Sequence, residues 1–255
     1  MNLVRVNDLK APDDHSIPGL LLTPDAPPPG GAVVIHPYGG TKEQMLGVAL
    51  ALAEKGIACL LPDLCGHGEN HTEIGVGMLE EMEASIRYAR RFGHPTLAAG
   101  ISLGGRLALM SSADYMVAIS PAVVSEISPQ GKWMFENFPS PAVREPYSGY
   151  VTELLDKLGP VPKHARPCLL LYSECDIPMI LEGAAGLKAD LAGAEVRHVT
   201  REIRPDIKHD NGLVRYLPRW FNHGELKFNA ECVETTAEWA AAHLTRSAQI
   251  ASPRA

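Results

Sequence analysis

Short apolar runs alternate with longer amphipathic runs from residue 32 to the end of the chain, and this alternation constrains the fold more than any other feature. Runs such as residues 32–35 and 57–61 are apolar throughout, as expected of strands buried on both faces of a sheet. The amphipathic runs between them are long enough to form helices. This pattern predicts an α/β fold, with a mainly parallel central sheet and helices on both faces.

The chain is expected to form one domain. We predict strands at residues 3–6, 17–22, 32–35, 57–61, 97–99, 116–119, 168–172 and 196–203. We predict helices at residues 41–55, with Thr41 as the N-cap, and at residues 72–92, 104–110, 181–191 and 230–244. Residues 121–166 break the alternation and are rich in proline and aromatic residues, which indicates an insertion over one edge of the sheet, serving as a partial cap. The domain then spans residues 1–245, and residues 246–255 are expected to form a flexible tail.

The composition excludes several classes of protein. The apolar fraction is 45%, the formal net charge is −7 and no basic stripe is present, so no nucleic-acid partner is expected. No apolar run reaches about 18 residues, so no membrane partner is expected. The five cysteines are scattered without a C-x-x-C pair, and the first residues lack the apolar core of a secretory signal. We therefore expect reduced thiols and a cytoplasmic location. A homodimer is compatible with the sequence.

The sequence Gly100-Ile101-Ser102-Leu103-Gly104 matches the G-x-S-x-G pattern. It follows a predicted strand and precedes a predicted helix, and a turn this sharp strains the serine backbone and excludes bulky neighbours. The turn would lift the Ser102 hydroxyl above the sheet, and the N–H of Leu103 at the helix start could face an oxyanion. The alternative is a tight glycine-rich turn without chemistry. The context of strand, turn and helix favours a nucleophilic serine.

Across nearly its whole length the chain resembles the α/β-hydrolase superfamily, in particular its carboxylesterase and dienelactone-hydrolase-like branches. By this resemblance Ser102 is the nucleophile. The sequence His36-Pro37-Tyr38-Gly39-Gly40 resembles the oxyanion loop of the family, with proline where a glycine is usual. Pro37 offers no N–H, so the resemblance implies the N–H of Tyr38 as the second oxyanion donor, with its phenol as the alternative. His36 is expected to hold the loop.

A second histidine-containing loop, Asp63-Leu64-Cys65-Gly66-His67-Gly68, resembles the D-x-x-G-H-G loop of the same family. Asp63 and His67 are tempting as catalytic residues. However, Asp63 precedes Ser102 in the chain, whereas the acid of this fold follows the nucleophile. We therefore expect Asp63 to accept hydrogen bonds from nearby backbone N–H groups within the turn.

The resemblance also implies the order serine, acid, histidine along the chain. It places the acid at Asp176, after the predicted strand at residues 168–172, with Glu174 as the rival. It places the base at His209, in the loop after the predicted strand at residues 196–203. His223 lies further along the chain and is the rival for the base. His198 lies within a predicted strand and is interpreted as structural.

Together these residues predict a serine hydrolase that cleaves an ester, thioester or lactone of a small acyl substrate through an acyl-enzyme intermediate. Neither cofactor nor metal is predicted: no G-x-G-x-x-G follows a strand, and His67 and His71 lack a third ligand. An acyltransferase or another non-hydrolytic enzyme with the same triad, or a non-catalytic binding module, is the alternative. Aromatic residues of the insertion are candidates for substrate binding: Trp133, Phe135, Phe138 and Tyr147.

Overall fold

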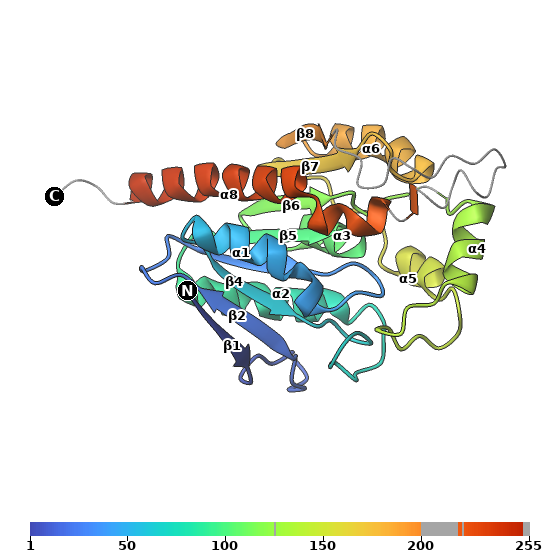
Figure 1. Cartoon of the computed structure of the whole chain (residues 1–255), viewed down its shortest axis with the longest axis horizontal. Helices are drawn as coiled ribbons and strands as arrows, with labels where there is room; N and C mark the ends of the chain where they lie inside the picture. The colour runs from blue at the N-terminus through green and yellow to red at the C-terminus, as the bar shows by residue number, and fades with distance from the viewer. Residues whose placement is uncertain (125, 200–218, 221, 252–255) are drawn as a thin grey trace.

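The computed structural model describes residues 1–124, 126–199, 219–220 and 222–251, and side chains as far as residue 244 (Figure 1). In this part of the chain, eight strands form one sheet in the order β1-β2-β4-β3-β5-β6-β7-β8. The strands are β1 (Asn2–Val6), β2 (Gly19–Thr23), β3 (Gly31–Ile35), β4 (Ala58–Pro62), β5 (Leu97–Ile101), β6 (Tyr115–Ile119), β7 (Cys168–Ser173) and β8 (Ala194–Val199). From β4 to β8 neighbouring strands are parallel, whereas β1 and β2 pair in antiparallel fashion. The predicted α/β fold with a mainly parallel sheet is confirmed.

Strand order creates a crevice at the centre of the sheet. The chain runs from β3 to its neighbour β4 and then crosses back to β5 on the other side of β3. Ile35 at the end of β3 lies opposite Gly100 near the end of β5. Ligands of open parallel sheets bind at the carboxyl ends of strands where the order reverses in this way. The segments after β3 and β5 therefore flank the expected binding position.

Helices cover both faces of the sheet, and each strand of the centre divides its side chains between them. In β3, Val33 and Ile35 pack in the core that includes helices α2 (Met78–Ala89) and α3 (Leu103–Met110). Ala32 and Val34 pack in the opposite core, with α1 (Leu46–Glu54) and α8 (Ala230–Ala251). This period of two residues is what a strand buried on both faces requires.

The insertion contains two helices, α4 (Pro129–Asn137) and α5 (Val151–Lys157). Ser128 caps α4 by accepting a hydrogen bond from the Gly131 N–H, 3.1 Å away, and Pro129 occupies the first turn, where its missing N–H costs nothing. Figure 1 shows both helices beyond the ends of the strands, on the side away from the C-terminus. The insertion thus lies at one end of the sheet rather than along its lateral edge.

Several helix boundaries differ from those predicted, and three of the differences are larger than the others or have a clear local cause. The predicted helix at residues 41–55 starts as a 3-10 turn, η1 (Lys42–Met45), and the Thr41 side chain does not cap it. Residues 72–77 are not helical, because Ile74 is buried against the Gly66 turn and glycines precede Met78. The last helix continues to Ala251, into the segment predicted as a flexible tail. Further helices are α6 (Pro178–Asp190), η2 (Arg90–Phe92) and η3 (Leu226–Phe228). Among the described residues, no helix combines the length and apolar character needed to cross a membrane.

Candidate active site

Ser102 occupies the sharp turn between β5 and α3. Its backbone lies in the left-handed region, with φ 54° and ψ −116°, a strained conformation for a residue other than glycine. A Cβ atom on Gly104 would lie 2.5 Å from the Ile35 carbonyl oxygen, and one on Gly100 would lie 2.5 Å from the Gly104 carbonyl carbon. The glycines of the motif are therefore required by close packing of backbone on backbone, as the sequence pattern predicts.

Asp176 follows β7 and is completely buried. Its Oδ1 accepts a hydrogen bond of 2.7 Å from the Ile177 N–H, and its Oδ2 accepts one from the Ser120 hydroxyl. Glu174, the rival acid, is exposed. Ser120 was not predicted from the sequence. It directly follows β6, the strand beside β7, and this position next to the end of β7 is the signal that would have pointed to it.

His223 is the histidine that meets this carboxylate. Its Nδ1 donates a hydrogen bond of 2.8 Å to Oδ1 of Asp176, and its side chain is only 11% exposed. The base predicted from the sequence, His209, lies outside the described residues. The contact therefore favours the rival that was ranked second. Chain order and strand position indicate that the histidine follows β8, but they do not specify how far along the connection it lies.

The surroundings of Asp176 keep its carboxyl group ionised. Burial alone would raise the pKa of Asp176, but the positive charge and hydrogen bond of His223 lower it. The hydrogen bonds from Ser120 and Ile177 lower it further, and the net result is a pKa below the ordinary value. Asp176 is thus a carboxylate throughout the range near pH 6.5 in which histidines usually titrate, as is required to orient an imidazole.

Ser102 and His223 line one cavity of about 290 Å³. The predicted oxyanion residues Tyr38 and Leu103 line the same cavity. Most of the remaining wall is apolar and comes from the insertion, from the start of α6 and from residue 220. These wall residues are Ala122, Val124, Ile127, Phe135, Val151, Leu155, Ile177, Met179, Ile180 and Trp220.

Tyr38 reaches the cavity from the segment after β3. Its hydroxyl donates a hydrogen bond of 2.5 Å to Oε2 of Glu145, a residue of the insertion. Burial, reinforced by Glu145, raises the pKa of Tyr38 well above its ordinary value. The phenol is therefore neutral and already engaged, which favours the backbone N–H as the group available to an oxyanion.

The four aromatic residues predicted to bind substrate occupy different positions. Phe135 lines the cavity and packs edge-on against Trp220, with ring centroids 4.7 Å apart. The rings of Trp133 and Phe138 pack against each other, with centroids 5.7 Å apart, and Phe138 is 52% exposed. The Tyr147 hydroxyl is bound to the carboxylate of Glu153. Of these four residues, only Phe135 is part of the cavity wall.

Two buried histidines, His36 and His67, lie near the predicted oxyanion loop, with ring centroids 4.8 Å apart. His36 is buried, with Nδ1 donating to the Pro37 carbonyl at 2.8 Å and Nε2 accepting from the Leu64 N–H at 3.2 Å. Burial lowers the pKa of His36 to about 4 and that of His67 to about 3, so both rings are neutral at pH 7. His36 holds the loop in place, as expected from the sequence.

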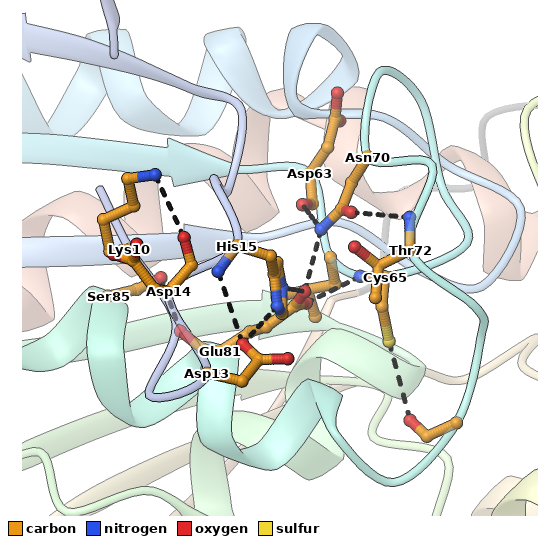
Figure 2. Close-up of polar contacts among 12 residues, drawn as sticks. Lys10, Asp13, Asp14, His15, Asp63, Cys65, Asn70, Thr72, Glu81 and Ser85 are labelled. Carbon is orange, nitrogen blue, oxygen red and sulfur yellow. Dashed lines mark hydrogen bonds and ion pairs between the residues drawn. The ribbon is translucent and has the colours of Figure 1, made fainter. Parts of the chain in front are cut away.

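Hydrogen bonds to Asp63 and to Glu81 hold the loop after β4, residues 63–70, in place. Asp63 accepts hydrogen bonds from the N–H groups of Lys42, at 2.8 Å, and Glu69, at 2.9 Å, which agrees with the turn-forming role expected for it. At the other end, the buried Glu81 accepts from the Cys65 N–H at 2.6 Å and from Asn70 Nδ2 at 2.9 Å (Figure 2). These bonds make the loop a rigid border beside the segment that carries Tyr38. Within the described ranges, no group of three or more His, Cys, Asp or Glu side chains is arranged to hold a metal ion.

Comparison with solved structures identifies the fold. The hyperthermophilic esterase from Pyrobaculum calidifontis matches with a TM-score of 0.59 and 18% identity, over 97% of this chain and 86% of its own. Est1E from Butyrivibrio proteoclasticus, solved with ferulic acid bound, matches with a TM-score of 0.58 and 18% identity, over 81% and 94%. The α/β hydrolase GrgF from Penicillium sp. sh18 matches with a TM-score of 0.60 and 12% identity, over 78% and 90%.

No protein-family model matches the sequence, and a search of curated proteins finds no match either. The similarity to these proteins thus lies in the arrangement of the chain rather than in overall sequence. The chain has the α/β-hydrolase fold, and the resemblance noted in the sequence is confirmed at this level.

Proposed function

We propose that this protein is a serine hydrolase that cleaves carboxylic esters, with Ser102 as nucleophile, His223 as base and Asp176 as the acid that orients the base. The proposal rests above all on one observation: the histidine hydrogen-bonded to the buried Asp176 lines the same cavity as the strained elbow serine. Fold likeness to an esterase is consistent with this activity.

The proposed reaction proceeds in two halves. With Nδ1 of His223 bonded to Asp176, its Nε2 is the nitrogen that accepts the proton of the Ser102 hydroxyl as the oxygen attacks the ester carbonyl. The tetrahedral oxyanion is stabilised by the N–H groups of Tyr38 and Leu103. The alcohol leaves with the proton from His223 and the acyl group stays on Ser102. Water then attacks with the same proton relay and releases the carboxylic acid.

The cavity wall bears on the class of ester. Its aliphatic and aromatic lining can bury an apolar acyl or alcohol group, and each buried methylene contributes about 0.8 kcal/mol to binding. A volume of about 290 Å³ corresponds to the small end of ligand sites in proteins. The preferred substrate is therefore expected to be a small ester.

The function is tested by measuring kcat/KM for p-nitrophenyl esters of increasing acyl length. The proposal predicts Ser102-dependent hydrolysis whose kcat/KM rises over the short acyl chains and falls once the chain exceeds the cavity. Thioester and amide analogues of the best acyl group, and alcohol acceptors added to the ester assay, distinguish ester hydrolysis from acyl transfer. Absence of turnover for every ester would contradict the proposal.

Tyr38→Phe separates the two groups that Tyr38 could offer to the oxyanion. The substitution keeps the backbone N–H and removes the hydroxyl that is bound to Glu145. We expect kcat to change by less than about threefold, because loss of a true oxyanion donor costs about 100-fold or more. Steady-state kinetics on the best p-nitrophenyl ester provide the measurement. A 100-fold loss of kcat, with the melting temperature unchanged, would show that the phenol is the donor.

A further inference from the structure

A buried lysine lies in the wall of the same cavity and has no part in the proposed acyl transfer. Lys227, in η3, is 7% exposed and lines the cavity together with Ser102 and His223. Its ammonium donates a hydrogen bond to the carbonyl of Gly224, the residue that directly follows His223. The cation is therefore held beside the segment that carries the proposed base.

Within the described residues Lys227 forms no ion pair with a carboxylate, and the more distant charge of Glu225 only partly offsets the effect of burial on its pKa. The ammonium carries three donors, of which the Gly224 carbonyl takes one. Its other described contact is with the ring of Phe228, whose centroid is 4.7 Å away. By contrast, the buried ammonium of Lys42 contacts carboxylate oxygens of Glu43, Asp63 and Glu69 within 3.0 Å. The buried guanidinium of Arg106 instead donates its hydrogen bonds to backbone carbonyls. An unpaired cation in an apolar cavity is costly unless an anion joins it.

Burial lowers the pKa of Lys227 below its ordinary value, which reflects this cost. An anionic group bound beside the ammonium would offset the cost by direct attraction and by a charge-assisted hydrogen bond. Gln44, from η1, also lines the cavity, and α1, which continues from η1, contacts η3. Figure 1 shows the start of α8, next to η3, close to α1. The polar residues Lys227 and Gln44 thus come from elements other than the insertion, which contributes much of the apolar wall.

We propose that the substrate of this cavity is an ester that carries a carboxylate, and that Lys227 binds this carboxylate while the apolar wall holds the rest of the molecule. The inference rests on the proposed esterase function. Lys227 and the side-chain amide of Gln44 suit a carboxylate with a single negative charge. Doubly charged phosphate groups are usually held by several cations or by arginine side chains that donate two hydrogen bonds. Hydrolysis adds water across the acyl–oxygen bond and leaves the distal carboxylate unchanged.

The test compares pairs of esters that differ in charge and hardly in shape. The first pair is the mono-p-nitrophenyl ester of adipic acid and its uncharged isostere, p-nitrophenyl 6-methylheptanoate. The second pair carries the group on the alcohol side: 4-carboxyphenyl and 4-carbamoylphenyl hexanoate. For each pair the ratio of kcat/KM, charged over uncharged, is measured for the wild type, Lys227→Met and Lys55→Met. Lys55 is an exposed lysine at the C-terminal end of α1. Lys55→Met is therefore a control that removes one positive charge elsewhere in the protein.

For at least one pair, the ratio for the wild-type enzyme should exceed one, and this pair identifies the end of the substrate that Lys227 binds. Lys227→Met should lower that ratio by about 10- to 100-fold, the range expected for a hydrogen bond to a charged group, and Lys55→Met should leave it unchanged. Wild-type ratios below one for both pairs, alongside Ser102-dependent hydrolysis of the uncharged esters, would overturn the inference and leave the esterase function intact. An equal loss on both members of each pair in Lys227→Met would also overturn it. Because the wild-type ratio needs no variant, the test holds even if Lys227→Met does not fold.

Discussion

Replacing His223 by glutamine should lower kcat for the best p-nitrophenyl ester by about 10,000-fold or more, the loss seen when one member of such a triad is removed. Glutamine keeps a side chain of similar length but cannot take the proton of Ser102. Asp176 would keep its hydrogen bonds from Ile177 and Ser120, so the fold should survive. Activity is measured by steady-state kinetics and folding by thermal denaturation.

His209→Gln is the matched control for this experiment. His209 was predicted as the base from the sequence, whereas His223 is the histidine that contacts the Asp176 carboxylate. The control should therefore keep a substantial part of the wild-type kcat. An inactive His209→Gln enzyme beside a nearly active His223→Gln enzyme would return the role of base to His209.

Ser102→Ala should abolish hydrolysis to the same extent, because the reaction then lacks its nucleophile. Ser102 and His223 are proposed to act as one unit, so the double variant Ser102→Ala/His223→Gln should be no less active than Ser102→Ala alone. Ser111→Ala, at the other end of α3, removes a buried hydroxyl bonded to the Ala108 carbonyl at 2.7 Å. This control should cost about 1 kcal/mol of unfolding free energy and leave kcat unchanged. Wild-type turnover by Ser102→Ala would disprove the nucleophile assignment.

The turn that carries Ser102, the proposed nucleophile, was predictable from the sequence because its constraints are local. Gly100 and Gly104 are required by backbone contacts within a few residues and by the neighbouring strand β3. Asp176 was likewise predictable because it follows the end of β7 directly, and its carboxylate is buried as an acid of this kind requires. The parallel sheet was predictable for a similar local reason. A strand that is buried on both faces has an unbroken run of apolar residues in its sequence.

The proposed base was harder to predict because its position depends on the length of a connection. Sequence order places a histidine somewhere after β8, and both His209 and His223 satisfy that condition. Only the contact of a histidine with Asp176 in three dimensions separates them. Ser120 was missed because its role arises between strands, where the end of β6 meets the residues that follow β7.

Aromatic composition was a poor guide to the cavity. Trp133, Phe138 and Tyr147 share the segment of Phe135 but face other parts of the molecule, and sequence composition does not reveal which face of a short helix points inwards. Aliphatic residues of the insertion, such as Ile127 and Leu155, supply much of the wall instead. Trp220 comes from a different part of the chain and packs edge-on against Phe135.

In the proposed mechanism, Ser102 is a nucleophile activated by His223. A fluorophosphonate reacts covalently with such a serine, and peptide mass spectrometry locates the modified residue. We expect the adduct on Ser102 in the wild type, formation of the same adduct slowed by orders of magnitude in His223→Gln, and rapid formation in His209→Gln. Absence of an adduct on Ser102, or an equal rate of labelling in wild type and His223→Gln, would contradict this mechanism.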